Sequence, residues 1–472
     1  EVAAGAAYAG ARAMVTMKQV GLNVASDPLM SLAYVGIKGG MVVVVADDPG
    51  PISSQTEQDI RQFALFSKLP VFDPTSPEEA YRLIADAFEC SEKYRTPVLF
   101  RPTTRVCHGC ASVALLPSLD VREPEGFHGD PGRWVMFPRL SYQSHLMIEA
   151  RKPEIGDDFS ALPFNEISGA PDAARGVASG GVSYEYAMET LDLKQFRLLK
   201  VATPHPFPEK LALEFLKGLD EVLVLEELDP VIERALLHLV GKHHLTVTIR
   251  GKLSGDTRVA GENSVESVRG DIARFLGQSV PESTPADAPA LPVRPPVLCA
   301  GCPHRASFYA AKTAAKNFEK TVYCGDIGCY TLGNAAPLNT VDTCLCMGAG
   351  ITIAQGIKLA EKETKCIAFI GDSTFFHTGI PGVINAVYQN TDITIAVLDN
   401  HTTAMTGGQP HPGTGRTAMG MPAKPIDIEK ILRACGVEHI STVDPFKYED
   451  TVDAFKRAME HSGPSAVIAR AP

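Results

Sequence analysis

The sequence predicts an α/β protein built from three parallel-sheet domains. Its 472 residues give room for about three domains of ordinary size. Apolar runs of strand length, such as residues 41–46 and 365–370, alternate with longer helical stretches. Strand–helix–strand order of this kind produces a parallel sheet covered by helices. With 45% apolar and 21% charged residues, the chain has the composition of a protein with packed cores rather than of a disordered one.

The composition argues against several classes of function. A net charge of −11, a single Trp and no clustered basic face do not predict a nucleic-acid binder. No apolar run reaches the about 18 residues of a membrane span, and eleven cysteines are too few for a disulfide scaffold. We therefore expect a cytoplasmic protein. The sequence begins at Glu1 without Met, and we expect it to be a fragment that lacks residues at one or both ends.

The first domain is expected over residues 1–116. Residues 1–12 are rich in Ala and Gly and predict a helix, and residues 41–46 predict a buried strand. Ser76 followed by Pro77 is a typical helix start, and the helix continues to about Tyr94. Residues 97–101 predict the next strand. The region 117–175 has no clear period and is interpreted as a connector that crosses the surface.

A second α/β domain is expected over residues 176–278, and a third over 297–472. In the second domain the sequence predicts three strands and two helices, which are strands 198–203, 221–226 and 246–249, a helix over 209–219 and a helix from 230. Residues 279–296 form a linker, because six prolines between 279 and 296 prevent a regular helix.

The third domain carries the most informative motif. The strand 365–370 ends in Gly371, Asp372 and Ser373, and after a helical stretch the strand 393–398 leads to Asn400. Parallel strands bind ligands at their carboxyl ends, so Asp372 and Asn400 are expected to face one another. Oxygen ligands of this kind suit Mg²⁺, which usually binds together with phosphate oxygens. Gly371 would let a phosphate approach the backbone. The alternative is a chance strand–helix–strand unit with a surface Asp.

With 26 residues between Ser373 and Asn400, this motif resembles the fingerprint of thiamine diphosphate enzymes. Thr-Gly-Gly-Gln at 406–409 resembles the ferredoxin-dependent 2-oxoacid oxidoreductases among them. Cys-Ala-Gly-Cys-Pro-His at 299–304 and Gly-Asp-Ile-Gly-Cys-Tyr at 325–330 are most similar to the large (alpha) subunit of indolepyruvate ferredoxin oxidoreductases. The segments that resemble its pyrimidine-binding domain are 10–12, 18–24, 47–51, 53–59 and 101–105. The resemblance covers essentially the whole chain and is weakest over 117–175.

The resemblance implies a fold, an activity and partners. Pyrimidine-binding and diphosphate-binding domains would flank a transketolase C-terminal-like domain. The activity would be oxidative decarboxylation of aryl pyruvates such as indolepyruvate to aryl-acetyl-CoA, with electrons passed to ferredoxin. A smaller beta subunit would complete a heterotetramer of two alpha and two beta subunits. The alternatives are an oxidoreductase for another 2-oxoacid, a non-oxidative thiamine diphosphate decarboxylase, and a non-catalytic scaffold in an electron-transfer complex.

The resemblance also implies roles for individual residues. Asp372, Asn400 and the Thr402 carbonyl would hold Mg²⁺, and Ser373 and Thr374 would lie at the diphosphate. The glutamate that activates the cofactor is expected a few residues before Glu1, so that the chain as given lacks it. Met405 stands where pyruvate-specific relatives carry a polar residue, which favours a bulky aryl substrate. The alternative is that Met405 simply packs.

Several cysteines, histidines and one lysine have weaker assignments. Cys299, Cys302 and Cys329 would supply three of the four thiolates of a [4Fe–4S] cluster, the fourth being expected past Pro472. The alternative is that they are buried cysteines, and zinc is disfavoured because no fourth ligand has finger-like spacing. The run of cysteines that marks a two-cluster ferredoxin module is absent from the sequence. Cys344 and Cys346 are expected to pack near the cofactor, and Cys107 and Cys110 are a weak candidate for metal binding. His304, His377 and His401 would have either an acid–base or a structural role. Lys18 would contact a carboxylate or a coenzyme A phosphate, or else would be a solvated surface lysine.

Overall fold

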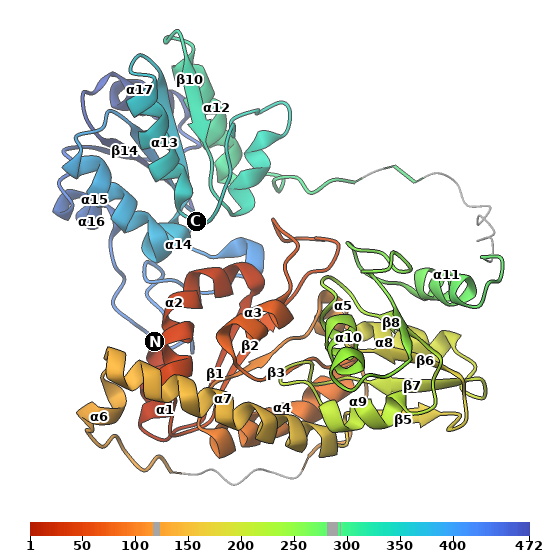
Figure 1. The fold of residues 1–472 in the computed structure, drawn as a ribbon. Helices are drawn as coiled ribbons and strands as arrows, with labels where there is room; N and C mark the ends of the chain where they lie inside the picture. Colours follow the sequence, from red (N-terminus) through yellow and green to blue (C-terminus); the bar gives the residue numbers. More distant parts are fainter. Residues whose placement is uncertain (117–122, 281–290, 293) are drawn as a thin grey trace. The chain divides into compact units, whose positions relative to one another are not determined.

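The computed structural model describes residues 1–116, 123–280, 291–292 and 294–472, and it consists of two compact units (Figure 1). The first unit spans Glu1–Asp287 and the second Ala288–Pro472. The described residues form three sheets, all parallel except for one antiparallel edge strand. This confirms the predicted α/β class, while the predicted domain boundaries stay a prediction. In the described residues, no helix is long and apolar enough to cross a bilayer.

The first sheet of the first unit has the parallel order β1-β2-β4-β3. Its strands are β1 (Ala13–Lys18), β2 (Met41–Ala46), β3 (Val71–Phe72) and β4 (Val98–Phe100). The helices of this region are α1 (Val2–Tyr8), α2 (Gln19–Val35), α3 (Ile60–Ser67), α4 (Pro77–Tyr94) and α5 (Thr104–His108). The Ser76 side chain accepts a hydrogen bond from the Glu79 N–H and begins α4, as predicted. The predicted helix over 1–12 is too long, because α1 ends at Tyr8 and β1 follows it.

The region expected to be an irregular connector contains a long helix. It holds α6 (Pro131–Trp134) and the 24-residue α7 (Pro138–Ala161), which packs against α2. The buried residues of α7 include Ser144, Ile148, Ile155 and Phe159, which recur at helical spacing. Exposed apolar residues on the other side of α7, among them Tyr142, Leu146 and Met147, hide this period in the sequence. Periodicity alone therefore did not reveal the helix.

The second sheet of the first unit has the order β5-β7-β6-β8-β9, with β5 antiparallel at one edge. Its strands are β5 (Glu166–Gly169), β6 (Arg175–Ser179), β7 (Phe196–Lys200), β8 (Glu221–Leu225) and β9 (Thr248–Arg250). Its helices are α8 (Val182–Thr190), α9 (Glu209–Leu216), α10 (Val231–Lys242) and α11 (Val265–Phe275). The strands and helices predicted here are confirmed within a few residues. Most of the predicted linker, residues 281–290 and 293, lies outside the described residues.

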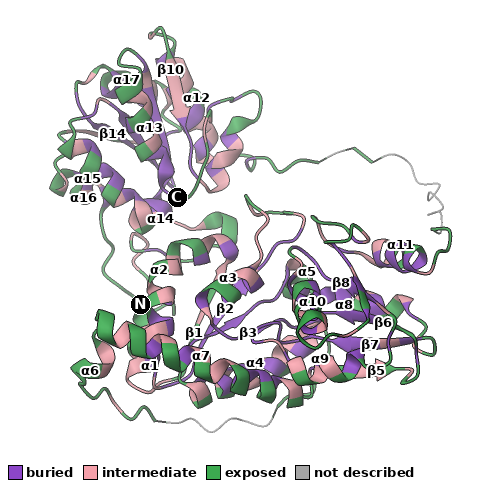
Figure 2. Cartoon of the chain, in the orientation of Figure 1, coloured by how far each residue is buried: buried purple, intermediate pink, exposed green. Residues whose placement is uncertain are grey.

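The second unit has one parallel sheet of order β10-β11-β12-β14-β13. Its strands are β10 (Thr321–Cys324), β11 (Lys365–Gly371), β12 (Thr394–Asp399), β13 (His439–Val443) and β14 (Ser465–Arg470). Its helical segments are α12 (Pro303–Ala315), η1 (Cys329–Asn334), α13 (Ala349–Ala360), α14 (Asp372–Thr374), η2 (Phe375–Gly379), α15 (Ile380–Tyr388), η3 (Ala404–Thr406), α16 (Ile428–Ala434) and α17 (Tyr448–Glu460). The sheet is buried on both faces, as Figure 2 shows.

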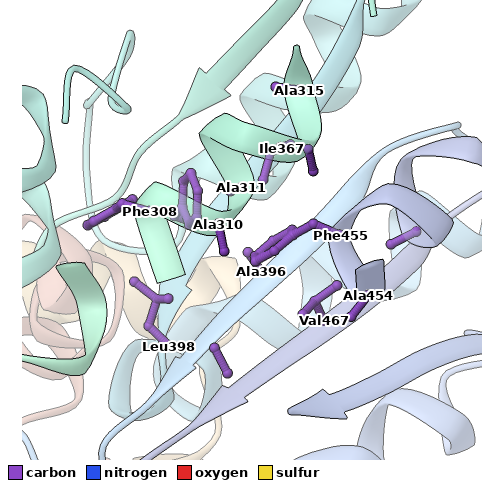
Figure 3. Close-up of a cluster of buried hydrophobic side chains, with 14 of the residues drawn as sticks. Phe308, Ala310, Ala311, Ala315, Ile367, Ala396, Leu398, Ala454, Phe455 and Val467 are labelled. Carbon is purple, nitrogen blue, oxygen red and sulfur yellow. The ribbon is translucent and has the colours of Figure 1, made fainter. Parts of the chain in front are cut away.

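Alternate side chains of each strand enter opposite cores of the second unit. Phe369 of β11 packs with Phe308 of α12 and Phe455 of α17 in one core. Figure 3 shows this core and labels Phe308 and Phe455. Its neighbour Ile370 packs on the other face, with residues of α13, α15 and α16. Strands buried on both faces read as continuous apolar runs, which is why β11 and β12 are visible in the sequence.

A network of buried ion pairs joins the two sheets of the first unit. The Arg61 guanidinium lies 2.7 Å from Asp59 and 2.8 Å from Glu226, which follows β8 in the second sheet. Arg101, after β4, pairs with Asp47 at 2.7 Å and with another buried carboxylate, Asp73, at 3.1 Å. Every one of these side chains is at most 2% exposed. Because a buried charge is costly without its partner, this network fixes how the two sheets meet.

Replacing Arg61 with Met should destabilise the chain strongly. The substitution leaves Asp59 and Glu226 as buried carboxylates without their cation, which costs about 3–5 kcal/mol of the free energy of unfolding. Chemical denaturation followed by circular dichroism measures the change. Arg82→Met is the matched control, because the Arg82–Glu78 pair is about half exposed and contributes little. Equal effects of the two substitutions would contradict the importance of the network.

Candidate functional site

The register of β11 and β12 brings two aspartates together at the carboxyl edge of the sheet of the second unit. Gly371 pairs with Leu398, so the next residues along each strand are Asp372 and Asp399. Their relative exposures are 3% and 4%. Asn400, predicted to face Asp372, follows one residue later. Asp399 is a part of the edge to which the sequence analysis gave no role.

A cavity of about 120 Å³ opens at this edge, inside the second unit. Its wall includes all seven residues that the sequence singled out for the cofactor and substrate, namely Gly371, Asp372, Ser373, Thr374, Asn400, Thr402 and Met405. His304, Cys329 and Tyr330 line the same cavity. The structure therefore gathers residues from the loops after β10, β11 and β12 in one place.

Asp372 is held by two hydrogen bonds. Its Oδ1 accepts the N–H of Ser373 at 2.7 Å, and its Oδ2 lies 3.1 Å from Nε2 of His411. Burial by itself raises the pKa of Asp372, but the hydrogen bonds from His411 and Ser373 outweigh it, so the pKa lies below its usual value. The carboxylate is therefore ionised at neutral pH. The neighbouring Asp399 forms an ion pair with Arg470: the Arg470 Nε lies 2.7 Å from the Asp399 Oδ2.

Hydrogen bonds between hydroxyls and backbone tie the loops around the cavity together. Thr403 Oγ1 donates to Ser373 Oγ at 2.9 Å, which joins the loops after β12 and β11. The Thr402 N–H donates to Asn400 Oδ1 at 3.3 Å. At Gly371, an added Cβ would lie 2.5 Å from Cε1 of Tyr330. The glycine is thus needed to seat the Tyr330 ring, which is a reason the sequence motif did not reveal.

Asp326 and Tyr330 form a second polar group beside the cavity that the sequence analysis did not identify. Asp326 is fully buried and accepts the N–H groups of Ile327 at 2.6 Å and Gly348 at 2.7 Å. Burial raises its pKa to about 6 against the effect of these bonds. The Tyr330 hydroxyl lies 3.1 Å from Asp326 Oδ2 and 3.2 Å from Thr374 Oγ1. The one feature of the sequence that could have indicated this role is the position of Asp326 just after the strand β10.

The three histidines named from the sequence differ in placement. His304 is 4% exposed and lines the cavity, and burial lowers its pKa to about 4, so it is neutral at neutral pH. His401 is exposed, with Nε2 3.5 Å from Asp399 Oδ1. His377 is exposed on the helical turn η2. Of the three, only His304 forms part of the cavity wall.

The donor groups at the cavity suit a hard divalent cation. The wall offers the Asp372 carboxylate together with Asn400 and Thr402, whose amide and carbonyl oxygens are ligands of the kind Mg²⁺ prefers. Among the described residues, no three His, Cys, Asp or Glu side chains form a group able to hold a metal ion. These three donors fit Mg²⁺ as part of a shell only, because the ion usually takes further oxygens from phosphate and water.

The cysteines proposed for a cluster lie near one another in the second unit. Cys302 precedes α12, Cys329 begins η1, and both pack against the core of Figure 3. Burial raises the pKa of Cys329, and the charges of Cys302 and Cys299 raise it further, which shows that the thiols are neighbours. They do not form a preformed site for one metal ion.

The remaining candidates have other surroundings. Cys344 and Cys346 are exposed rather than packed, although Cys344 Sγ lies 3.7 Å from the Asp326 carbonyl oxygen. Cys107 and Cys110 are exposed free cysteines. In the first unit, the Lys18 Nζ donates to Ser53 Oγ at 3.0 Å. Glu1 precedes α1 and lines an apolar cavity of about 390 Å³ between α1, β1, β2 and α2.

Family models match both units. One described as "Pyruvate flavodoxin/ferredoxin oxidoreductase", thiamine diphosphate-binding, matches residues 1–133. Another, described as "Thiamine pyrophosphate enzyme, C-terminal TPP binding domain", matches residues 326–469 and so includes the whole cavity edge. Both models describe thiamine diphosphate-binding domains of enzymes, and they match parts of each unit.

Full-length relatives place the chain more closely. The indolepyruvate oxidoreductase subunit IorA of Methanothermobacter thermautotrophicus is 43% identical over 482 residues, covering all of this chain and 77% of the relative. The subunit of the same name from Pyrococcus abyssi is 41% identical and covers all of this chain and 76% of the relative. The 2-oxoglutarate synthase subunit KorB of Archaeoglobus fulgidus is 33% identical over 37% of this chain and 68% of its own length. The chain belongs to the family of the indolepyruvate oxidoreductase subunit IorA, which confirms the predicted resemblance.

Removing the Asp372 carboxylate should abolish binding of thiamine diphosphate. Asp372→Ala deletes the single cavity-wall carboxylate that His411 and Ser373 hold ionised. We expect the apparent Kd for thiamine diphosphate with Mg²⁺ to rise by more than about 100-fold, beyond the usual effect of losing an outer-shell partner. Isothermal titration calorimetry measures it. Asp453→Ala, at an exposed position of α17, is the control. Retention of binding by Asp372→Ala would disprove the assignment.

Proposed function

We propose that the chain is the thiamine diphosphate-binding subunit of an enzyme that oxidatively decarboxylates aryl pyruvates, such as indolepyruvate, to aryl-acetyl-CoA. The carrying observation is the cavity at the edge of β11 and β12, where Asp372, Asn400 and Thr402 meet. These three would hold Mg²⁺, and Ser373 and Thr374 would contact the diphosphate. When bound, thiamine diphosphate supplies the nucleophilic carbon for the 2-oxo group and the electron sink for decarboxylation.

Met405 supports the choice of a bulky substrate. It lies on η3, is 52% exposed and contributes its side chain to the cavity wall. A flexible thioether adapts to an aromatic ring and makes favourable sulfur–aromatic contacts. His304, neutral and buried in the same wall, has an N–H to donate to a polar group of the substrate. The wall therefore combines an adaptable apolar side chain with a polar one.

The acid that activates the cofactor is proposed to lie near the start of the sequence. The resemblance puts it a few residues before Glu1. Glu1 itself is exposed and is not the candidate.

The electron route and the partners are proposed from the cysteines and the relatives. Cys299, Cys302 and Cys329 would be ligands of a [4Fe–4S] cluster that passes electrons to ferredoxin, and coenzyme A would accept the acyl group. The relatives are named as subunits, which supports a smaller beta subunit as partner. An assembly of two alpha and two beta subunits and a cytoplasmic location are part of the same proposal.

Turnover of the full-length complex tests the substrate. Anaerobic enzyme loaded with thiamine diphosphate, Mg²⁺ and coenzyme A should reduce ferredoxin or viologen with indolepyruvate faster than with pyruvate. Met405→Ser should lower kcat/KM for indolepyruvate by about 10-fold, because the aromatic side chain loses apolar contact, and should spare pyruvate. Equal or better rates with pyruvate would contradict the aryl pyruvate assignment and favour another 2-oxoacid. Decarboxylation without electron transfer would favour a non-oxidative enzyme.

Iron content tests the cluster. Cys329→Ser in the full-length protein should lose iron and the visible absorbance of the cluster after anaerobic reconstitution, because a hydroxyl is a poor substitute for a thiolate ligand. Cys110→Ser changes an exposed cysteine of the other unit and serves as control. Unchanged iron in Cys329→Ser would remove this residue from the ligand set.

A further inference from the structure

The loop of residues 401–427, which follows β12, contacts the sheet edge through Thr403, which hydrogen-bonds Ser373, and through His411, which hydrogen-bonds Asp372. The structure describes the whole loop, and His411 is its single buried residue, at 7% exposure. The same loop carries Thr402 and Met405 on the cavity wall. The contacts of the buried His411 therefore help to position the loop.

Two hydrogen bonds define the protonation of the His411 ring. Its Nδ1 accepts the N–H of Gly413 at 3.1 Å, so Nδ1 carries no proton. The ring proton then lies on Nε2, which is 3.1 Å from Oδ2 of Asp372. His411 thus donates from Nε2 to the carboxylate and accepts at Nδ1 from the backbone.

Packing holds the ring in this orientation. The Phe376 ring stacks on it, with centroids 5.7 Å apart and planes inclined by 30°. At Gly413, an added Cβ would lie 3.0 Å from Cε1 of His411 and 3.1 Å from Cε2 of Phe376. The glycine lets the backbone close over the ring. Phe376 and Gly413 therefore hold the His411 ring in place by packing against it.

We propose that His411 is a positioning residue that couples the metal side of the site to the substrate loop. By donating from Nε2 it fixes the Asp372 carboxylate for Mg²⁺, and each carboxylate oxygen keeps a lone pair for the ion. Through the same bond it ties the 401–427 loop, with Met405, to Asp372. Cation binding and loop order then stabilise one another. The proposal rests on the proposed function only for the identity of the cation and cofactor.

The first test measures Mg²⁺ binding to the full-length protein. His411→Leu removes the donor, and the apparent Kd for Mg²⁺ in the presence of thiamine diphosphate should rise about 10–100-fold. His411→Gln keeps a terminal N–H donor and should restore most of the affinity. His439→Leu is the control, because His439 begins β13 and so lies at the opposite end of the parallel strands from the cavity. This variant should bind Mg²⁺ like the unaltered protein. A Gln variant as weak as the Leu variant would overturn the hydrogen-bonding role.

The second test needs neither cofactor nor turnover, so it is independent of the proposed function. Arg416 is an exposed residue of the loop. Tryptic cleavage after Arg416 should be faster in His411→Leu than in the unaltered protein, with His411→Gln in between. Unchanged cleavage would overturn the anchoring. If His411→Leu binds Mg²⁺ normally but is cleaved faster, the proposed function is wrong, whereas the anchoring of the loop by His411 is confirmed.

A third measurement uses the unaltered protein and covers the case in which the Leu variant does not fold. Nitrogen-15 NMR of histidine-labelled protein should show His411 with an unprotonated Nδ1 and a protonated Nε2 at neutral pH. A protonated Nδ1 would overturn the proposed donor geometry, because Nδ1 accepts from Gly413 in the structure.

Discussion

The parallel register of β11 and β12 is the constraint on which the site of the second unit depends. It sets Asp372 and Asp399, both buried, side by side at the carboxyl edge of the sheet. Two carboxylates in such a place are unfavourable unless cations or donors compensate them. Arg470 and His411 do part of this, and a divalent cation held by Asp372 would complete it. In the first unit, buried carboxylates are compensated by two buried arginines, because Arg61 and Arg101 together pair with four carboxylates.

Much of the fold is predictable from local sequence because its central strands are buried on both faces. β2, β11 and β12 are continuous apolar runs, and α4 has a Ser-Pro start whose capping bond is present in the structure. β1 was missed because it is an edge strand with mixed burial that follows an Ala-rich helix without a break in composition. α7 was missed because apolar residues lie on both its buried and its exposed sides.

The candidate site is predictable where its residues follow strands. Asp372 and Asn400 were found from the spacing between two strand ends, and the cavity includes both. His411 was not found, because it lies 39 residues from Asp372 in a loop of Pro, Gly and Thr that has no period. Tyr330 and Asp326 likewise act through contacts that only the folded chain creates. Spacing thus identifies the residues on the sheet edge, whereas the residues that orient them come from distant segments.

The most direct measurement is an experimental structure of the full-length protein with thiamine diphosphate and Mg²⁺. We predict Mg²⁺ at about 2.0–2.1 Å from a carboxylate oxygen of Asp372, with Asn400 and Thr402 in its shell and the diphosphate next to Ser373. His411 should still donate to Asp372. A diphosphate bound away from the edge of β11 and β12, with Asp372 bonded only to protein groups, would contradict the assignment of this edge as the cofactor site.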